Sequence, residues 1–233
     1  MAKAKAAERR EDALSHDRIV EAAIELLDAE GESGLTFRAL AERLATGAGA
    51  IYWHVANKGE LLAAASDAIV GRAMAVVVTH ASPQKTIRGI ALGVFDALDA
   101  HPWAGAQLSR GPWQTGMLQV LECIGRQLQA LGVPERAQFT AASTLVSYIF
   151  GESDQNATNG SSLSPAATRD EFLGALAARW EALDARAFPF LRSIAPRLRH
   201  HDDRAELLAG VDIILAGIAA SPERPASRKP RTH

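Results

Sequence analysis

Apolar residues recur at helical spacing near the start of the chain, in short groups separated by breaks that contain glycine. The first group follows Ser15, a typical N-cap residue, and ends at Gly31. Its apolar members lie three or four positions apart, as they do on one face of a helix. These members are Ile19, Ala23, Ile24 and Leu27. We therefore expect a first helix between Ser15 and Gly31.

Two further short helices are predicted in the segment 35–62. Thr36 is a candidate N-cap, and the residues after it form an apolar stripe of about two turns: Phe37, Leu40, Ala41 and Leu44. After Gly47, Ile51 and Val55 are four positions apart and must share the buried face of a short helix. Two short helices joined by a tight turn indicate a helix-turn-helix, which places its second helix in a DNA major groove.

The second helix of this pair ends in an aromatic run, Tyr52-Trp53-His54. Helical geometry turns Trp53 and His54 away from the face that Ile51 and Val55 bury. Exposed rings with a hydroxyl and an imidazole fit contacts to a nucleic-acid backbone and to base edges. Asn57 is expected to cap the next helix, and Lys58 adds a cation where a phosphate can lie against a helix N-terminus.

The remainder of the chain also has helical periodicity, and no sustained alternation of apolar and polar residues indicates a strand. We therefore predict an all-α fold. An irregular segment is expected between Pro102 and Pro112, and a flexible polar loop at 159–164. The later helices are expected at 58–80, 82–100 and 114–131, from 134 onward, at 164–185, and from 203 onward.

Composition limits the classes of protein that fit. The chain has 233 residues, 48% of them hydrophobic and 6% aromatic, which is enough to bury a good core. The single cysteine, Cys123, excludes an intramolecular disulfide and a zinc site built from cysteines. No hydrophobic run resembles a secretory signal, and no apolar stretch approaches a membrane span of ~20 residues. We expect a cytoplasmic protein.

The net charge of −2 and the pI of 6.4 do not fit a strongly basic DNA-binding protein. A DNA-binding face then requires basic residues to gather on one side while acidic residues lie elsewhere. The basic residues available for such a face are Lys3, Lys5, Arg9, Arg10, Arg18, Arg38 and Lys58. Few phosphates would be neutralised, so we expect only a modest salt dependence of binding.

Residues 18–69 resemble the N-terminal DNA-binding domain of TetR-family transcriptional regulators. The resemblance lies in the run EGESGLTFRALAERLATGAGAIYWHVANKGELL, in which Tyr52-Trp53-His54-Val55 and Asn57-Lys58 are similar to the tetracycline-repressor-like subgroup. His101-Pro102-Trp103 and the helices around 121 and 148–151 resemble that subgroup's ligand-binding domain more loosely. The resemblance implies a repressor that binds a palindromic double-stranded DNA operator as a homodimer and is released by a small organic effector.

The same resemblance implies how the chain is divided. A three-helix DNA-binding domain would be followed by a helical effector-binding and dimerisation domain, with flexible ends. The expected divisions are a flexible N-terminal arm of basic and acidic residues at 1–14, the helix-turn-helix domain at 15–60, the ligand-binding and dimerisation domain at 61–220, and a disordered tail at 221–233.

The DNA contacts are assigned to the helix-turn-helix and to the start of the next helix. These residues are Arg38, Thr46, Ala48, Ala50, Tyr52, Trp53, His54 and Lys58. The Ala48-Gly49-Ala50 run departs from the family's usual residues, because alanine contacts only a thymine methyl and glycine reads no base. Base discrimination is therefore expected to depend mainly on Arg38, Thr46 and the aromatic run, helped by indirect readout.

An effector cavity is expected around the segment between Pro102 and Pro112, with apolar rings and a few orienting polar groups. Its expected residues are Trp103, Gln107, Arg110, Trp113, Met117, Phe139 and Gln155. The histidine and glutamate of the tetracycline-repressor magnesium site correspond to Gln107 and Gln155, and amides bind magnesium poorly. We therefore expect a metal-free organic effector and no cofactor.

Two late helices are more apolar than a single helical layer requires, and the family's equivalent pair forms a four-helix interface between subunits. The expected interface residues are Leu145, Ile149, Leu208, Val211 and Leu215. Dimerisation also follows from the DNA, because one short helix contacts too few base pairs for useful specificity. The alternative is that both helices belong to the core of one protomer.

Two other classes of function are weighed against the regulator. An all-helical small-molecule carrier with a vestigial helix-turn-helix fits the acidic pI and the Ala48-Gly49-Ala50 run. An enzyme is the third alternative and the least favoured, since the sequence shows no set of catalytic residue types expected to meet at one site. The run 200–203, His-His-Asp-Asp, contains metal-ligating residue types, but adjacent side chains diverge, so a solvated turn with a helix cap is expected. Cys123 is expected to be an inert core thiol.

Overall fold

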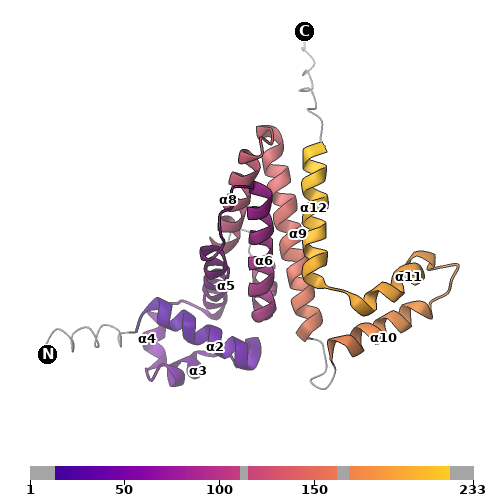
Figure 1. Ribbon diagram of the computed structural model, residues 1–233. Coiled ribbons are helices and arrows are strands. Elements are labelled where there is room, and N and C mark those ends of the chain that lie inside the picture. The colour runs from indigo at the N-terminus through magenta and orange to yellow at the C-terminus, as the bar shows by residue number, and fades with distance from the viewer. Residues whose placement is uncertain (1–13, 111–114, 162–167, 221–233) are drawn as a thin grey trace, which may run out of the picture.

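A computed structural model of the chain describes residues 14–110, 115–161 and 168–220, and this part of the chain is all-α, without a strand (Figure 1). The helices are α2 (His16–Gly34), α3 (Phe37–Arg43), α4 (Ala48–Tyr52), α5 (Lys58–Ala75), α6 (Pro83–Ala100), α7 (Trp103–Arg110), α8 (Thr115–Ala130), α9 (Glu135–Ser161), α10 (Arg169–Glu181), α11 (Pro189–Ile194), the 3-10 helix η1 (Ala195–His200) and α12 (Asp203–Ala220).

Helices α2, α3 and α4 form a small head at one end of the molecule (Figure 1). Ser15 caps α2, as predicted, since its Oγ accepts a hydrogen bond from the backbone N–H of Arg18 at 3.3 Å. Gly31 breaks the helical geometry with φ 68°, as predicted, although a last helical turn continues to Gly34. Thr36 caps α3, accepting from the backbone N–H of Ala39 at 3.1 Å. These local bonds fix where the helices of the head begin and end.

The body is an upright bundle of α5, α6, α8, α9 and α12 (Figure 1). Helix α6 packs against α9 and α12, and α8 packs against α5 and α9. The start of α8 is held to α5 by Asp67, whose carboxylate accepts from the backbone N–H groups of Thr115 and Gly116 at 3.1 and 2.7 Å. The bundle core consists of fully buried aliphatic side chains, among them Ile87, Ile90, Leu98, Ile124, Leu128, Leu145 and Ile149.

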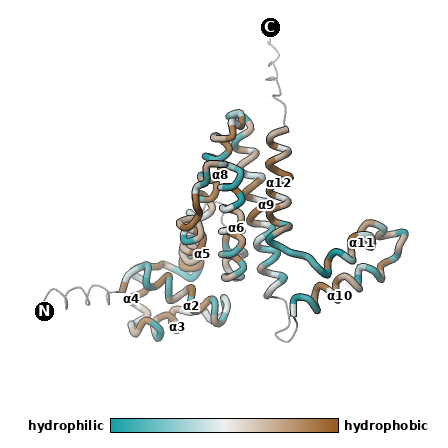
Figure 2. Tube along the Cα trace, in the orientation of Figure 1, coloured by the Kyte–Doolittle hydropathy of each residue, from teal (hydrophilic) through white to brown (hydrophobic). Residues whose placement is uncertain are grey.

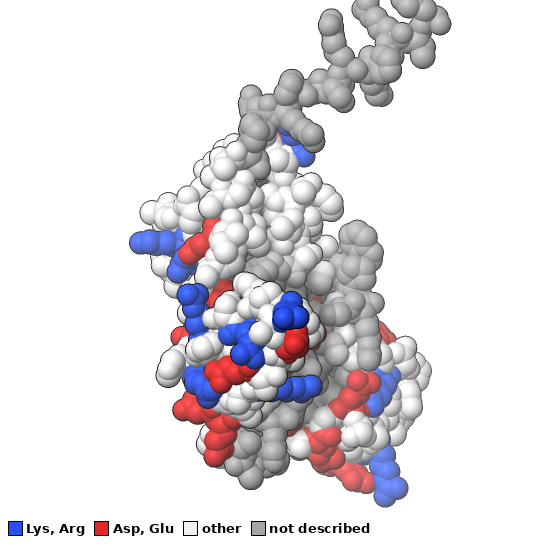
Figure 3. Space-filling view, turned by 90° about the vertical axis from the view of Figure 1, so that its right-hand side faces the viewer, with Lys and Arg blue, Asp and Glu red and all other residues white. Residues whose placement is uncertain are grey.

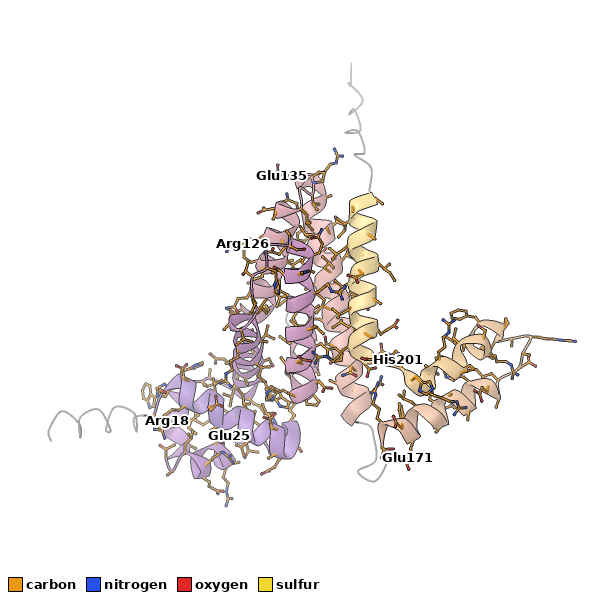
Figure 4. All side chains as sticks on the ribbon, viewed as in Figure 1. Arg18, Glu25, Arg126, Glu135, Glu171 and His201 are labelled. Carbon is orange, nitrogen blue, oxygen red and sulfur yellow. The ribbon has the colours of Figure 1, made fainter. Side chains whose placement is uncertain are left out.

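Helices α10, α11 and η1 form a hairpin arm that projects sideways from the body (Figure 1). A capping box begins the arm: Thr168 Oγ1 accepts from the backbone N–H of Glu171, and the Glu171 carboxylate accepts from the backbone N–H of Thr168 at 2.8 Å. These bonds lower the pKa of Glu171. Arg169 pairs with Asp203 at the start of α12, and Figure 4 shows His201 at this junction. The arm therefore meets the body at a polar joint.

Two predictions for the first half of the body are wrong. The helix expected at 58–80 ends at Ala75, and the exposed Val76 and Val78 lie in the connection to α6. β-branched residues have a lower helix propensity, which fits a helix that ends at this point. The segment after Pro102, expected to be irregular, forms α7, because the proline lies just before the helix, where its missing N–H costs no hydrogen bond.

Two predictions around the arm are also wrong. Helix α9 continues to Ser161, through Asn159 and Gly160, where a polar loop was expected. These residues are polar because that end of the helix is exposed. The following helix begins at Arg169 after the Thr168 cap rather than at residue 164, and residues 162–167 lie outside the described residues. In the described ranges no helix is both long and apolar enough to cross a bilayer.

Candidate nucleic-acid interface and its link to the helical body

Helix α4 presents its aromatic end to solvent, as the sequence predicted. Ile51 and Val55 anchor the segment, with exposed fractions of 0% and 1%, whereas Tyr52 is 55% and Trp53 is 90% exposed. His54 is exposed in the turn after the helix. Because Trp53 buries almost none of its surface in the protomer, it contributes little to packing there. The Tyr52, Trp53 and His54 side chains therefore form an accessible aromatic edge, which we call the α4 edge.

The other predicted readers on this segment are small or half-buried. Thr46 lies in the turn between α3 and α4, and Ala48 and Ala50 lie within α4; all three are half-buried. The turn depends on Ala45, whose φ of 51° is in the left-handed region. The turn lies before Gly47, as predicted, since Gly47 is the N-cap of α4. A left-handed residue after a helix is usually glycine, so residue type did not show that Ala45 takes this conformation.

The ring of Tyr52 does not extend freely from α4. It stacks on the ring of Phe37, the first residue of α3, with 4.3 Å between the ring centroids and 8° between the ring planes. Phe37 is half-buried and packs against the core of the head. One face of the Tyr52 ring is thus covered, and more than half of the residue remains exposed.

The arginines of α3 have acidic neighbours. Arg38 Nε lies 3.1 Å from Glu42 Oε1, and both side chains are exposed. Arg43 Nε donates to Glu25 Oε2 of α2 at 2.7 Å. The separation of basic and acidic residues that the sequence argument required is therefore absent at α3, which lowers the positive potential there. Lys3, Lys5, Arg9 and Arg10 lie outside the described residues.

The start of α5 is closed by its own side chains. Asn57 Oδ1 accepts from the backbone N–H of Glu60 at 2.9 Å, and the Glu60 carboxylate accepts from the backbone N–H of Ala56 at 2.8 Å. Asn57 is thus the cap that the sequence predicted. Lys58 is half-buried, and its ammonium donates to the backbone carbonyl of Glu32 in α2. The cation therefore ties α5 to α2 in this structure, and its contact with DNA stays a prediction.

A group of hydrogen bonds joins the head to the body through α2 and α7. Asp28 Oδ1 accepts from the indole Nε1 of Trp103 at 2.8 Å and lies 2.8 Å from His101 Nδ1. Gln107, only 7% exposed, donates from Nε2 to Glu32 Oε2 at 3.2 Å. We call this group the α2–α7 link. It makes α7 a direct contact of α2, the helix against which α3 packs.

The structure does not gather the predicted effector residues into one cavity. Trp103 and Gln107 belong to the α2–α7 link, while Phe139 is 74% exposed near the opposite end of the body. Phe139 and Gln155 lie about 24 Å apart along α9, from the helical rise per residue, and Gln155 is also exposed. Met117 is half-buried in α8. The side chain of Arg110 and the whole of Trp113 lie outside the described residues.

Most of the predicted interface residues are buried inside the protomer. Leu145, Ile149 and Val211 are fully buried and Leu215 is 9% exposed, while Leu208 is half-buried. These side chains form the contact between α9, α12 and the rest of the bundle, so their apolar character is explained within one chain. The opposite side of α12 is also apolar: Ile213 is 72% exposed, and Ala209, Ala216 and Gly217 are exposed beside it.

The run at 200–203 belongs to the joint of the arm. Asp202 Oδ1 accepts from the backbone N–H of Ala205 at 3.1 Å, which is the predicted helix cap. His201 Nε2 lies 3.1 Å from Asp203 Oδ1. Among the described residues no cluster of three or more histidine, cysteine or acidic side chains has the arrangement of a metal site.

Comparison with known proteins agrees with this geometry. Residues 19–65 match the family model of bacterial regulatory proteins, tetR family. An HTH-type transcriptional regulator of Saccharopolyspora erythraea is 33% identical over 144 residues, 61% of either chain. The class C tetracycline repressor of Escherichia coli is 39% identical over 71 residues, 30% of this chain and 31% of the repressor. The matched region thus spans less than two thirds of these two curated relatives.

A solved structure matches almost the whole fold. The transcriptional regulator SCO7222, a TetR from Streptomyces coelicolor, is 52% identical, and the match covers 89% of this chain and 99% of that one with a TM-score of 0.79. The head with its exposed α4 edge and the helical body define a helix-turn-helix transcriptional regulator. The chain belongs to the TetR family.

Proposed function

We propose that this protein is a transcriptional repressor that binds a palindromic operator as a homodimer and releases it when a small organic effector binds. In this proposal, 15–60 is the DNA-binding domain and 61–220 the effector-binding and dimerisation domain. The α4 edge is the observation that supports the proposal most directly, because Tyr52, Trp53 and His54 are exposed on a segment that Ile51 and Val55 anchor. A hydroxyl, an indole and an imidazole at that place fit phosphate and base-edge contacts.

Dimerisation is supported by the outer side of α12. Figure 2 shows apolar residues along most of this helix, and a helix that is apolar all round is normally buried on every side. One side is covered within the protomer, and Ile213 on the other side is exposed. In Figure 3, the face above the arm has few charged side chains. We therefore assign the subunit interface to the outer side of α12 and the adjoining exposed side of α9.

The arm gives the same assignment a second support. It follows α9 and precedes α12 in the chain. Its helices pack mainly against one another, with few contacts to the head or the bundle. Phe188 and Phe190 on it are 45% and 69% exposed. A second subunit seated against α9 and α12 would lie next to this arm. Two heads held in this way would meet successive major grooves about 34 Å apart.

The α2–α7 link supplies a route from effector to DNA. A ligand that displaces α7 would pull on Asp28 and Glu32 of α2, which packs against α3, and α3 in turn packs against α4. The heads would then change their separation, and a state with the wrong separation binds the operator poorly. Gln107 and Gln155 provide amides instead of carboxylates or imidazoles, which favours an effector that is bound without a metal.

The proposal is tested by replacing Tyr52 and His54 together with alanine. Gel shifts and footprinting on the DNA that flanks the gene should show a protected palindrome for the wild type and none for the double variant. Circular dichroism and the molar mass should be nearly unchanged, because both side chains are exposed and the buried Ile51 still anchors α4. Equal protection by the two proteins would reject α4 as the reading helix. Weak retention of every duplex by the wild type would favour the carrier with a vestigial head.

A further inference from the structure

Helix α4 has few internal means of holding its shape. It is five residues long, its N-cap Gly47 makes no side-chain capping bond, and Gly49 lies in its middle. Helices this short are not stable on their own, and an internal glycine costs about 1 kcal/mol relative to alanine. Its geometry must therefore come from contacts with the rest of the head.

Two such contacts are visible, one at each side of the helix. Ile51 anchors the inner side and is fully buried. At the C-terminal end, the Tyr52 ring lies on the Phe37 ring with a centroid distance of 4.3 Å and an interplanar angle of 8°. Phe37 is itself fixed, because Thr36 caps α3 directly before it and the core of the head packs against it. The stack thus joins the last residue of α4 to the first residue of α3.

We propose that Phe37 is a positioning residue for DNA recognition: its ring holds the Tyr52 ring so that the phenol hydroxyl and the free ring edge face the duplex. The inference rests on the proposed DNA-binding function and adds a residue that the assignment of DNA contacts did not contain. A tyrosine fixed before binding does not lose its side-chain freedom when the duplex arrives, so more of the contact energy appears as affinity. Phe37 has no need to touch DNA for this effect.

The test is a double-mutant cycle on the operator duplex found by footprinting. Phe37→Leu keeps an apolar side chain but removes the aromatic face. It should raise Kd about three- to tenfold, the range expected for an aromatic pair. In a Tyr52→Ala background the same change should have no further effect, because the ring it positions is gone. Phe37→Tyr, which keeps a stacking ring, should bind like the wild type. Leu118→Ala is the control, since Leu118 is 43% exposed on α8, outside both the head and the assigned interface.

A DNA-independent measurement separates the stack from the function. The chain has two tyrosines, so in a Tyr148→Phe variant the remaining tyrosine ring signals in NMR spectra belong to Tyr52. The stack predicts upfield ring-current shifts that Phe37→Leu abolishes. The positioning role would be overturned if Phe37→Leu lowered affinity equally in the wild-type and Tyr52→Ala backgrounds. It would also be overturned if Phe37→Leu lowered affinity in neither. If the wild type protects no duplex while the shifts are present, the proposed function fails and the stack is only structural.

Discussion

The indole Nε1 of Trp103 donates a hydrogen bond to Oδ1 of Asp28 across 2.8 Å, joining residues that are 75 positions apart in the chain. The same oxygen lies 2.8 Å from His101 Nδ1. One carboxylate of α2 therefore holds both the end of α6 and the start of α7. Since α2 also packs against α3 and α5, this oxygen is one of several contacts that hold the head to the body.

Replacing Trp103 with phenylalanine should lower the free energy of unfolding by about 1 kcal/mol, the usual net value of one hydrogen bond. The aromatic surface is largely kept, so the lost N–H donor is the main change. Urea unfolding followed by circular dichroism measures the difference. Trp53→Phe is the matched control, because Trp53 is 90% exposed and its change should stay within about 0.5 kcal/mol. Equal stability of the two variants would show that the bond does not stabilise the link.

Replacing Glu42 with glutamine should tighten operator binding about two- to fivefold at low salt, as expected for one exposed charge. Glu42 lies 3.1 Å from the predicted DNA contact Arg38 and brings a negative charge toward the duplex. Fluorescence anisotropy at several salt concentrations measures the effect, which should shrink as salt screens the charges. Glu122→Gln removes the glutamate of a similar pair with Arg126 on α8 and should change nothing. If Glu42→Gln and Glu122→Gln raised operator affinity equally, a local effect at α3 would be excluded.

The features that could be predicted from the sequence are those set by neighbouring residues. The caps Ser15, Thr36 and Asn57 were assigned from residue type, and each accepts the expected backbone hydrogen bond. The exposure of the α4 edge followed from the spacing of Ile51 and Val55 in the same way. Capping and helical periodicity act within one or two turns, so a single sequence contains the necessary information.

The features that could not be predicted depend on contacts between distant segments. Nothing near Asp28 shows that its carboxylate will meet Trp103, and nothing near Phe37 shows that Tyr52 will cover its ring. Most of the predicted interface residues are buried within one chain for a related reason. Helix α12 is apolar on both sides, so its pattern does not tell Val211, which faces the protomer core, from Ile213, which faces solvent.

Replacing Ile213 with aspartate should convert the protein from a dimer to a monomer. A charge on the outer side of α12 would be desolvated in the proposed interface and is not tolerated there without a partner. Light scattering after size exclusion should then give a mass near the chain mass of 24.8 kDa instead of twice that value. Val78→Asp is the control, since Val78 is 65% exposed between α5 and α6. An unchanged dimer in the Ile213 variant would place the interface elsewhere.

Replacing Glu152 with glutamine should stabilise the protein at neutral pH and have little effect in acid. Burial raises the pKa of Glu152, and the nearby carboxylates of Glu206 and Asp203 raise it further, against a smaller opposing effect of His201. Below the ordinary value of 4.5 the carboxyl is neutral in both the folded and the unfolded protein, so it costs nothing. As the pH rises through the raised pKa, the folded protein must hold a charge that the unfolded chain holds more easily, and stability is lost.

Glutamine has no such charge. The stability advantage of the variant over the wild type should therefore grow from pH 4 toward pH 7. Thermal unfolding at one protein concentration across this range measures it. A second readout comes from Tyr148, whose pKa is raised by burial and then by Glu152 and Glu206. Glu152→Gln removes one of these causes, so ultraviolet titration should show the pKa of Tyr148 moving down toward 10.0. If the stability difference does not change with pH and the pKa of Tyr148 does not shift, the Glu152 carboxylate is solvated in the folded protein.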